Sequence, residues 1–158
     1  MRETIGSTWI MQLMFGFILL FVSFLAITIS YSKSFRIKNE LTSIIEKYGG
    51  YNSTSSKIIG DYVRGLGYYN RGRCPERSLG VSDLSTGKPV EVSGSGLYYY
   101  CIKKEVVGNK SISNIYYEVT TFYKFNLPIV GDITTFSVKG KTTDLTDYRG
   151  TDCFESSC

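Results

Sequence analysis

The sequence predicts an α+β protein in which a long transmembrane helix continues into an amphipathic helix, packed on a small antiparallel β-sheet. Three observations carry this prediction: an uncharged apolar run near the N-terminus, a helical apolar period after it, and a period of two in the second half of the chain. Helices first and strands afterwards are typical of α+β folds with an antiparallel sheet. A chain of 158 residues has room for one such domain beside the helix.

The apolar run extends from Trp9 to Ser30 and contains no charged residue. About 22 helical residues span about 33 Å, which is enough to cross a hydrocarbon core of about 30 Å. Trp9 and Tyr31 flank the run, where amphipathic aromatic side chains favour the membrane interface. A cleaved signal peptide is the alternative, but its apolar region usually has about 7–15 residues and an A-x-A-like site after it. We therefore expect residues 1–8 to be a short N-terminal segment and residues 9–30 an uncleaved transmembrane helix.

Apolar residues continue at helical spacing after this run. Residues 31–50 are predicted to extend the helix, and Gly49 and Gly50 to stop it. The apolar stripe consists of Ile37, Leu41, Ile44, Ile45 and Tyr48. We expect this stripe to pack on the sheet face that carries Tyr117 and Val119, or to contact partner subunits.

Residues 51–158 are predicted to form one globular α+β domain. A short helix is expected to begin within residues 53–56, whose hydroxyls can cap it, and to end at Gly67. The segments with the period of a β-strand are residues 97–107, 115–127 and 133–141. The step Gly108–Asn109 suits a turn after the first strand, and Phe136 and Val138 are expected to point inward from the last.

Residues 75–96 are rich in glycine and serine and hold few large apolar side chains. We expect a long exposed loop here, with a short strand around Val90–Val92. Loops of this length in compact domains are either functional or without fixed structure. Both interpretations stay open from the sequence.

The four cysteines suit disulfides. A bridge from Cys74 to Cys101 would close a loop of about 26 residues and stabilise the fold by about 3 kcal/mol in the chain-entropy model. Cys153 and Cys158 can form a small ring in the C-terminal tail. Four cysteines allow three pairings, and the sequential one is favoured because each pair is local. A zinc site is the alternative, but neither pair has C-x₂-C spacing.

The chain contains no histidine. This removes the commonest general base, the commonest zinc ligand and the usual partner of a serine or cysteine nucleophile. The net charge is +4, and the basic residues are scattered without a nucleic-acid-binding motif. We therefore expect no enzyme activity, no catalytic, cofactor-binding or metal-ligating residues, no cofactor and no nucleic-acid partner.

Two signals bear on topology. The basic residues after the apolar run, Lys33, Arg36 and Lys38, outnumber the positive groups before it, which favours a cytoplasmic C-terminal domain. Four cysteines in a small domain rich in tyrosine and threonine favour an oxidising, external compartment instead. The charge difference is small, so we give more weight to the cysteines. We therefore expect an extracellular domain on a single-pass anchor in the cell membrane.

An apolar helix that runs into an amphipathic helix, followed by an antiparallel sheet and a C-terminal disulfide region, resembles the architecture of type IV pilins and pseudopilins. Residues 6–48 (GSTWIMQLMFGFILLFVSFLAITISYSKSFRIKNELTSIIEKY) and 116–142 (YYEVTTFYKFNLPIVGDITTFSVKGKT) are most similar to TadE-type pilus-assembly proteins of Gram-positive bacteria. A type IV prepilin has a glutamate five residues after its processing glycine or alanine. Here Met11 lies five residues after Gly6, and the nearby acidic residue Glu3 precedes Gly6 instead of following it. The resemblance therefore implies an uncleaved accessory component.

Two functions of different classes follow. The first is a pilin-like structural component of a surface pilus or secretion apparatus, whose partners are the lipid bilayer and other pilin-like or secretion-machine subunits bound through the N-terminal helix. The second is a membrane-tethered extracellular adhesin or ligand-binding module that uses the loop at 75–96.

Overall fold

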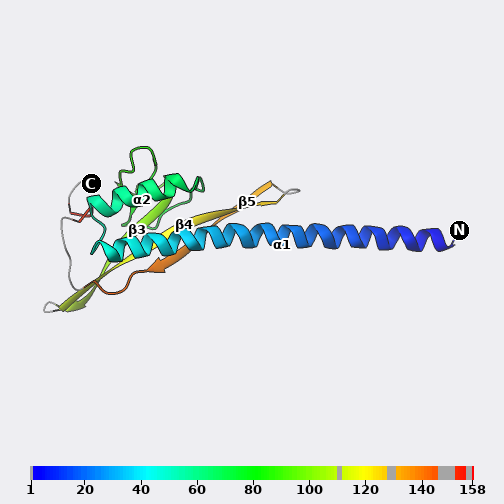
Figure 1. The fold of residues 1–158 in the computed structure, drawn as a ribbon, viewed down its shortest axis with the longest axis horizontal. Helices are drawn as coiled ribbons and strands as arrows, with labels where there is room; N and C mark the ends of the chain where they lie inside the picture. The colour runs from blue at the N-terminus through cyan, green and yellow to red at the C-terminus, as the bar shows by residue number, and fades with distance from the viewer. Residues whose placement is uncertain (1, 110–111, 128–130, 146–151, 156–157) are drawn as a thin grey trace.

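The computed structural model of this protein describes residues 2–109, 112–127, 131–145, 152–155 and 158. Helix α1 (Arg2–Lys47) is a rod whose first half projects away from the domain, whereas its second half lies along it (Figure 1). The helix begins at Arg2, before the predicted start at Trp9. No proline interrupts these residues, and extending an existing helix costs far less than nucleating one.

Two glycines end α1 as predicted. Gly49 adopts a left-handed φ of 67°, and its N–H donates to the carbonyl of Glu46. The N–H of Gly50 donates to the carbonyl of Ile45 at 2.9 Å. These two bonds form the Schellman arrangement, which satisfies carbonyls at the helix end that lack an intrahelical partner.

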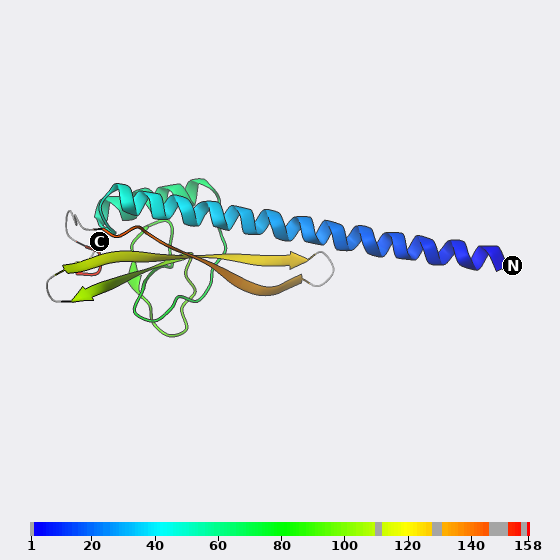
Figure 2. The same cartoon turned by 90° about the horizontal axis from the view of Figure 1, so that it is seen from below.

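Helix α2 (Ser53–Gly65) begins where the hydroxyl cluster predicts. Asn52 and Ser55 form a reciprocal capping box: the N–H of Ser55 donates to Asn52 Oδ1 at 2.9 Å, and the N–H of Asn52 donates to Ser55 Oγ at 2.8 Å. The helix ends two residues before the predicted Gly67, which takes a left-handed φ of 59° just after it. Both helices cover the same face of the sheet (Figure 2).

The sheet has five antiparallel strands in the order β2-β1-β3-β4-β5. The strands are β1 (Leu79–Val81), β2 (Val90–Glu91), β3 (Tyr100–Asn109), β4 (Ile112–Leu127) and β5 (Gly131–Lys141). The predicted α+β class is thus confirmed. The pair β4 and β5 extends beyond the other strands, alongside α1 and toward its projecting half (Figure 1).

The expected long loop at 75–96 is wrong in one respect. Strand β1 lies within it, is fully buried and pairs with β3, whereas the short strand expected near Val90 is present as β2. Three residues interrupted by Gly80 are too few to show a period of two in the sequence. Gly80 is needed because the ring of Tyr98 lies where a Cβ would be.

Two smaller expectations also fail. Gly108 and Asn109 continue strand β3 instead of turning, since they pair with Ser113 and Ile112 of β4. Phe136 does lie on the same face as buried Val138, but its side chain remains 40% exposed. It lies on the part of the β4–β5 pair that extends beyond the other strands, where it stacks on Tyr123.

The core fills the space between the helices and the sheet. Its fully buried members come from both helices, from the sheet and from the segments that follow each helix: Ile37, Leu41, Ile45, Tyr51, Ile59, Val63, Tyr68, Val81, Tyr100, Ile102, Tyr117 and Val119. A second, smaller cluster lies on the opposite face and contains Tyr98, Cys101 and Phe122. The middle of β3 and β4 is therefore buried on both faces. The second half of α1 packs against one of these faces.

Candidate membrane anchor and assembly surface

The first half of α1 is an uncovered apolar surface. From Thr8 to Val22 every side chain is exposed, with Trp9 70% and Leu20 68% accessible. In the part of the chain that the structure describes, this is the one helix long and apolar enough to cross a membrane, with a mean hydropathy of 2.5 in its most apolar window. This is consistent with a single-pass membrane anchor, and a signal sequence near the N-terminus meets the same criteria of helix length and hydropathy.

Two hydroxyl groups of the apolar run are satisfied within the helix. Ser23 Oγ donates to the carbonyl of Leu19 at 2.8 Å, and Thr28 Oγ1 donates to the carbonyl of Phe24 at 2.9 Å. Such bonds to the preceding turn leave no hydroxyl hydrogen without an acceptor. The helix can therefore enter hydrocarbon without carrying an unsatisfied donor from these two side chains.

The second half of α1 holds the predicted apolar stripe. Ile37, Leu41 and Ile44 are buried in the core, and Tyr48 is partly buried against it. The stripe packs on the sheet face that carries Tyr117 and Val119, the first of the two alternatives that the sequence leaves open. The structure thus brings all five residues of the predicted stripe, including fully buried Ile45, to one interface.

A polar clamp that the sequence does not reveal joins α1 to β4. Ser34 Oγ donates to the carbonyl of Phe122 at 3.0 Å, and Thr121 Oγ1 donates to the carbonyl of Ser34 at 3.2 Å. Tyr68, which follows α2, also binds β4 at the same place: its hydroxyl donates to the carbonyl of Phe122 and accepts from the N–H of Phe122. Burial raises the pKa of Tyr68, which keeps this hydroxyl protonated.

The structure pairs the cysteines sequentially. Cys74 is bonded to Cys101 with Cα atoms 5.6 Å apart, and Cys153 to Cys158 with Cα atoms 5.2 Å apart. The first bridge fastens the segment before β1 to β3 within the cluster of Tyr98 and Phe122. The second closes a small ring next to the core, where Cys153 is buried.

The C-terminal tail is fixed to the domain by Asp152, which has no exposed surface. Its carboxylate lies 2.6 Å from Lys104 Nζ and accepts a hydrogen bond of 3.1 Å from the Tyr117 hydroxyl. Burial opposes the charged form of Lys104, but the carboxylates of Asp152 and Glu155 outweigh it and raise the pKa of this lysine. The tail disulfide is thereby held against strands β3 and β4.

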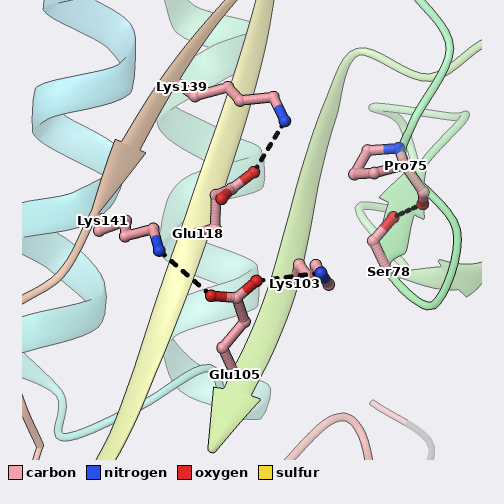
Figure 3. Close-up of polar contacts among 7 residues, drawn as sticks. All are labelled: Pro75, Ser78, Lys103, Glu105, Glu118, Lys139 and Lys141. Carbon is pink, nitrogen blue, oxygen red and sulfur yellow. Dashed lines mark hydrogen bonds and ion pairs between the residues drawn. The ribbon is translucent and has the colours of Figure 1, made fainter. Parts of the chain in front are cut away.

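The sheet face away from the helices carries alternating charges at its far end (Figure 3). Glu105 lies 3.0 Å from Lys103 and 3.2 Å from Lys141, and Glu118 lies 3.1 Å from Lys139. Hydrogen bonds from Lys103, and further ones involving Tyr116 and Lys141, lower the pKa of Glu105 to about 2. Exposed pairs like these contribute little stability, but opposite charges across neighbouring strands favour the observed register.

A shallow pocket of about 340 Å³ lies between α2 and the turn that follows β1. Its polar lining groups are Ser53, Ser56, Lys57, Asp61, Arg64, Ser85, Thr86 and Lys88. In the segment just before β1, Ser78 Oγ donates to the carbonyl of Pro75 at 2.6 Å (Figure 3). Only part of the sequence-predicted loop therefore remains available as a binding surface.

Among the described residues there is no group of three or more histidine, cysteine, aspartate or glutamate side chains placed to hold a metal ion. Comparison with protein-family models, with curated proteins and with solved structures finds no match for this chain. The functional argument therefore depends on the chain's own surfaces.

Proposed function

We propose that this protein is a membrane-anchored structural component of a pilin-like surface or secretion assembly. One observation carries the proposal: α1 is a single continuous helix that is exposed and, apart from Gln12, without strongly polar side chains from Trp9 to Val22, and whose second half is built into the core of the domain. A domain mounted on such a helix is fixed in orientation relative to whatever surrounds the helix. This is the property that an assembly of helix-anchored subunits requires.

The same continuity favours an anchor over a removable signal. The apolar stretch is longer than the apolar region of about 7–15 residues usual in signal peptides. It is also followed without a break by helix whose next buried residue, Ser34, is already clamped to β4. Cleavage near residue 30 would cut inside a regular helix, only one turn from that clamp.

The two disulfides support an external domain, since such bonds persist in oxidising compartments. We expect protease added to intact, wall-stripped cells to remove the C-terminal domain and leave a membrane-embedded fragment of α1. Immunoblotting with an epitope at each end of the chain measures this. Cells lysed before digestion, and a cytoplasmic protein followed in parallel, are the controls. Full protection in intact cells with digestion only after lysis would contradict the external topology.

The assembly contact is proposed to be the first half of α1. A photo-crosslinking residue in place of Leu20, which is 68% exposed, should form adducts in living cells with other copies of this chain or with helix-anchored subunits of a pilus or secretion machine. The matched control replaces Tyr69, an exposed residue of the domain. Mass spectrometry of the adducts identifies the partners. Adducts from Tyr69 but only lipid adducts from Leu20 would argue against this assembly surface.

A membrane-tethered adhesin is the second candidate, favoured by the pocket between α2 and the turn after β1. Four hydroxyls, three cations and the carboxylate of Asp61 surround it, and Asp61 is paired with Arg64, so that Lys57 and Lys88 are the cations left for a polar ligand. Lys57→Glu with Lys88→Glu should abolish ligand binding by an adhesin while leaving an assembly component's crosslinks at Leu20 intact. Deleting all of residues 75–96 would not separate the two functions, because it would also remove β1 and β2 from the sheet.

A further inference from the structure

We infer that a groove at the end of the domain nearest the apolar half of α1 binds the headgroup of an anionic phospholipid. The inference rests on the proposed membrane anchor. The groove has a volume of about 590 Å³ and lies between α1 and the C-terminal end of α2, which runs back along α1 toward its apolar half (Figure 1). Two cations and an apolar floor line it: Lys33, Arg36, Ile29, Ile37, Tyr62 and Leu66.

The height of the groove matches the membrane surface. The apolar run ends at Ser30, so Lys33 lies about 4.5 Å and Arg36 about 9 Å further along the helix. Headgroup regions extend about 5–8 Å beyond each side of the hydrocarbon core. Lys33 therefore lies within the headgroup layer, and the long side chain of Arg36 can reach back into it.

An aromatic cluster on another face of α1 gives the same height independently. Tyr31 packs edge-on against Tyr123, with ring centroids 5.7 Å apart, and Tyr123 stacks on Phe136 at 5.5 Å. Tyr31 and Phe136 remain exposed although both are large aromatic residues. Tyrosine rings at this level are typical of the interface between membrane and water.

The chemistry of the lining fits a phosphodiester. Lys33 and Arg36 are three residues apart and therefore neighbours on the helix surface, so one phosphate can contact both. No acidic residue is among the lining groups that the structure describes. Asp61, on the last turns of α2, is paired with Arg64 at 2.6 Å and so does not neutralise the two cations of the groove.

The floor of the groove selects a lipid over a soluble anion. Ile29 belongs to the exposed apolar half of α1, and Leu66 at the end of α2 is also exposed. An acyl chain next to the headgroup can cover both side chains and continue directly into the bilayer. A free phosphate or an acidic peptide would leave this apolar surface uncovered, or would have to enter the headgroup layer to reach it.

The test uses the full-length chain reconstituted in phosphatidylcholine vesicles that contain spin-labelled phosphatidylglycerol or spin-labelled phosphatidylcholine. Electron spin resonance measures the fraction of each labelled lipid immobilised by the protein. We expect the wild-type chain to prefer phosphatidylglycerol, and Lys33→Gln with Arg36→Gln to lower that preference by about fivefold for each cation removed. The matched control, Lys47→Gln with Arg73→Gln, removes the same charges outside the groove and should keep the preference.

The outcomes separate this inference from the anchor on which it rests. A chain that fails to float with vesicles of either composition would refute the anchor. A chain that floats but shows no preference, or equal loss in both double variants, would overturn the groove alone. A photo-crosslinking residue at Leu66 adds a direct readout: an adduct with the mass of phosphatidylglycerol is expected, and a peptide adduct from a neighbouring subunit would overturn the lipid assignment.

Discussion

Replacing Leu41 with alanine should lower the free energy of unfolding by about 2–5 kcal/mol. Leu41 has no exposed surface and lies in the core between α1, α2 and the sheet, so the truncation leaves a cavity that rigid neighbours cannot fill. Chemical unfolding of the soluble fragment from Tyr31 onward measures the change. This fragment keeps every residue of α1 that the structure shows to be buried, the first being Ser34. A domain of this size has a total stability of about 5–15 kcal/mol, so the loss would be a large part of it.

Two control variants define the specificity of this effect. Leu97→Ala removes the same atoms from a side chain that is 53% exposed and should cost much less than Leu41→Ala. Arg36→Ala removes an exposed charge from the same helix and should change the stability of the fragment by less than about 0.5 kcal/mol. Equal, negligible effects at Leu41 and Arg36 would contradict the packing of the stripe on the sheet and would assign it to partner subunits.

Removing the Cys74–Cys101 disulfide should be the second largest loss, at about 3–4 kcal/mol. The bridge joins residues 27 apart in sequence, and in the chain-entropy model the stabilisation grows with the length of the closed loop. The variant carries Cys74→Ala and Cys101→Ala, which avoids a free thiol and adds no polar group to the cluster of Tyr98 and Phe122. The free energy of unfolding is compared with that of the wild-type fragment under non-reducing conditions.

The tail bridge serves as the internal comparison. Cys153 and Cys158 are 5 residues apart, so the same model gives a smaller stabilisation of about 2 kcal/mol. Peptide mapping without reducing agent should recover both sequential pairs. Four free thiols in protein taken from its native compartment would contradict both disulfides. A larger loss of stability on removing the tail bridge than on removing the Cys74–Cys101 bridge would contradict the predicted order.

The sequence by itself determined the features that depend on local pattern. An uncharged run of apolar residues needs no distant partner to be recognised, and a stripe such as Ile37, Leu41 and Ile44 shows its helical face by spacing alone. The Schellman glycines Gly49 and Gly50 and the start of α2 are equally local, because the hydrogen bonds that fix them join residues within five positions. These signals sufficed for the α+β class and for the packing face of α1.

The tertiary structure decided what depends on residues far apart in the chain. Strand β1 has too few residues to show a period and exists because β3 pairs with it. The clamp of Ser34 on Phe122 joins positions 88 residues apart, and that of Tyr68 on Phe122 joins positions 54 apart. The lipid-binding groove likewise needs the end of α2 beside Lys33 and Arg36. The sequence around one residue does not identify a partner this far away in the chain, because the two residues become neighbours only in the folded protein.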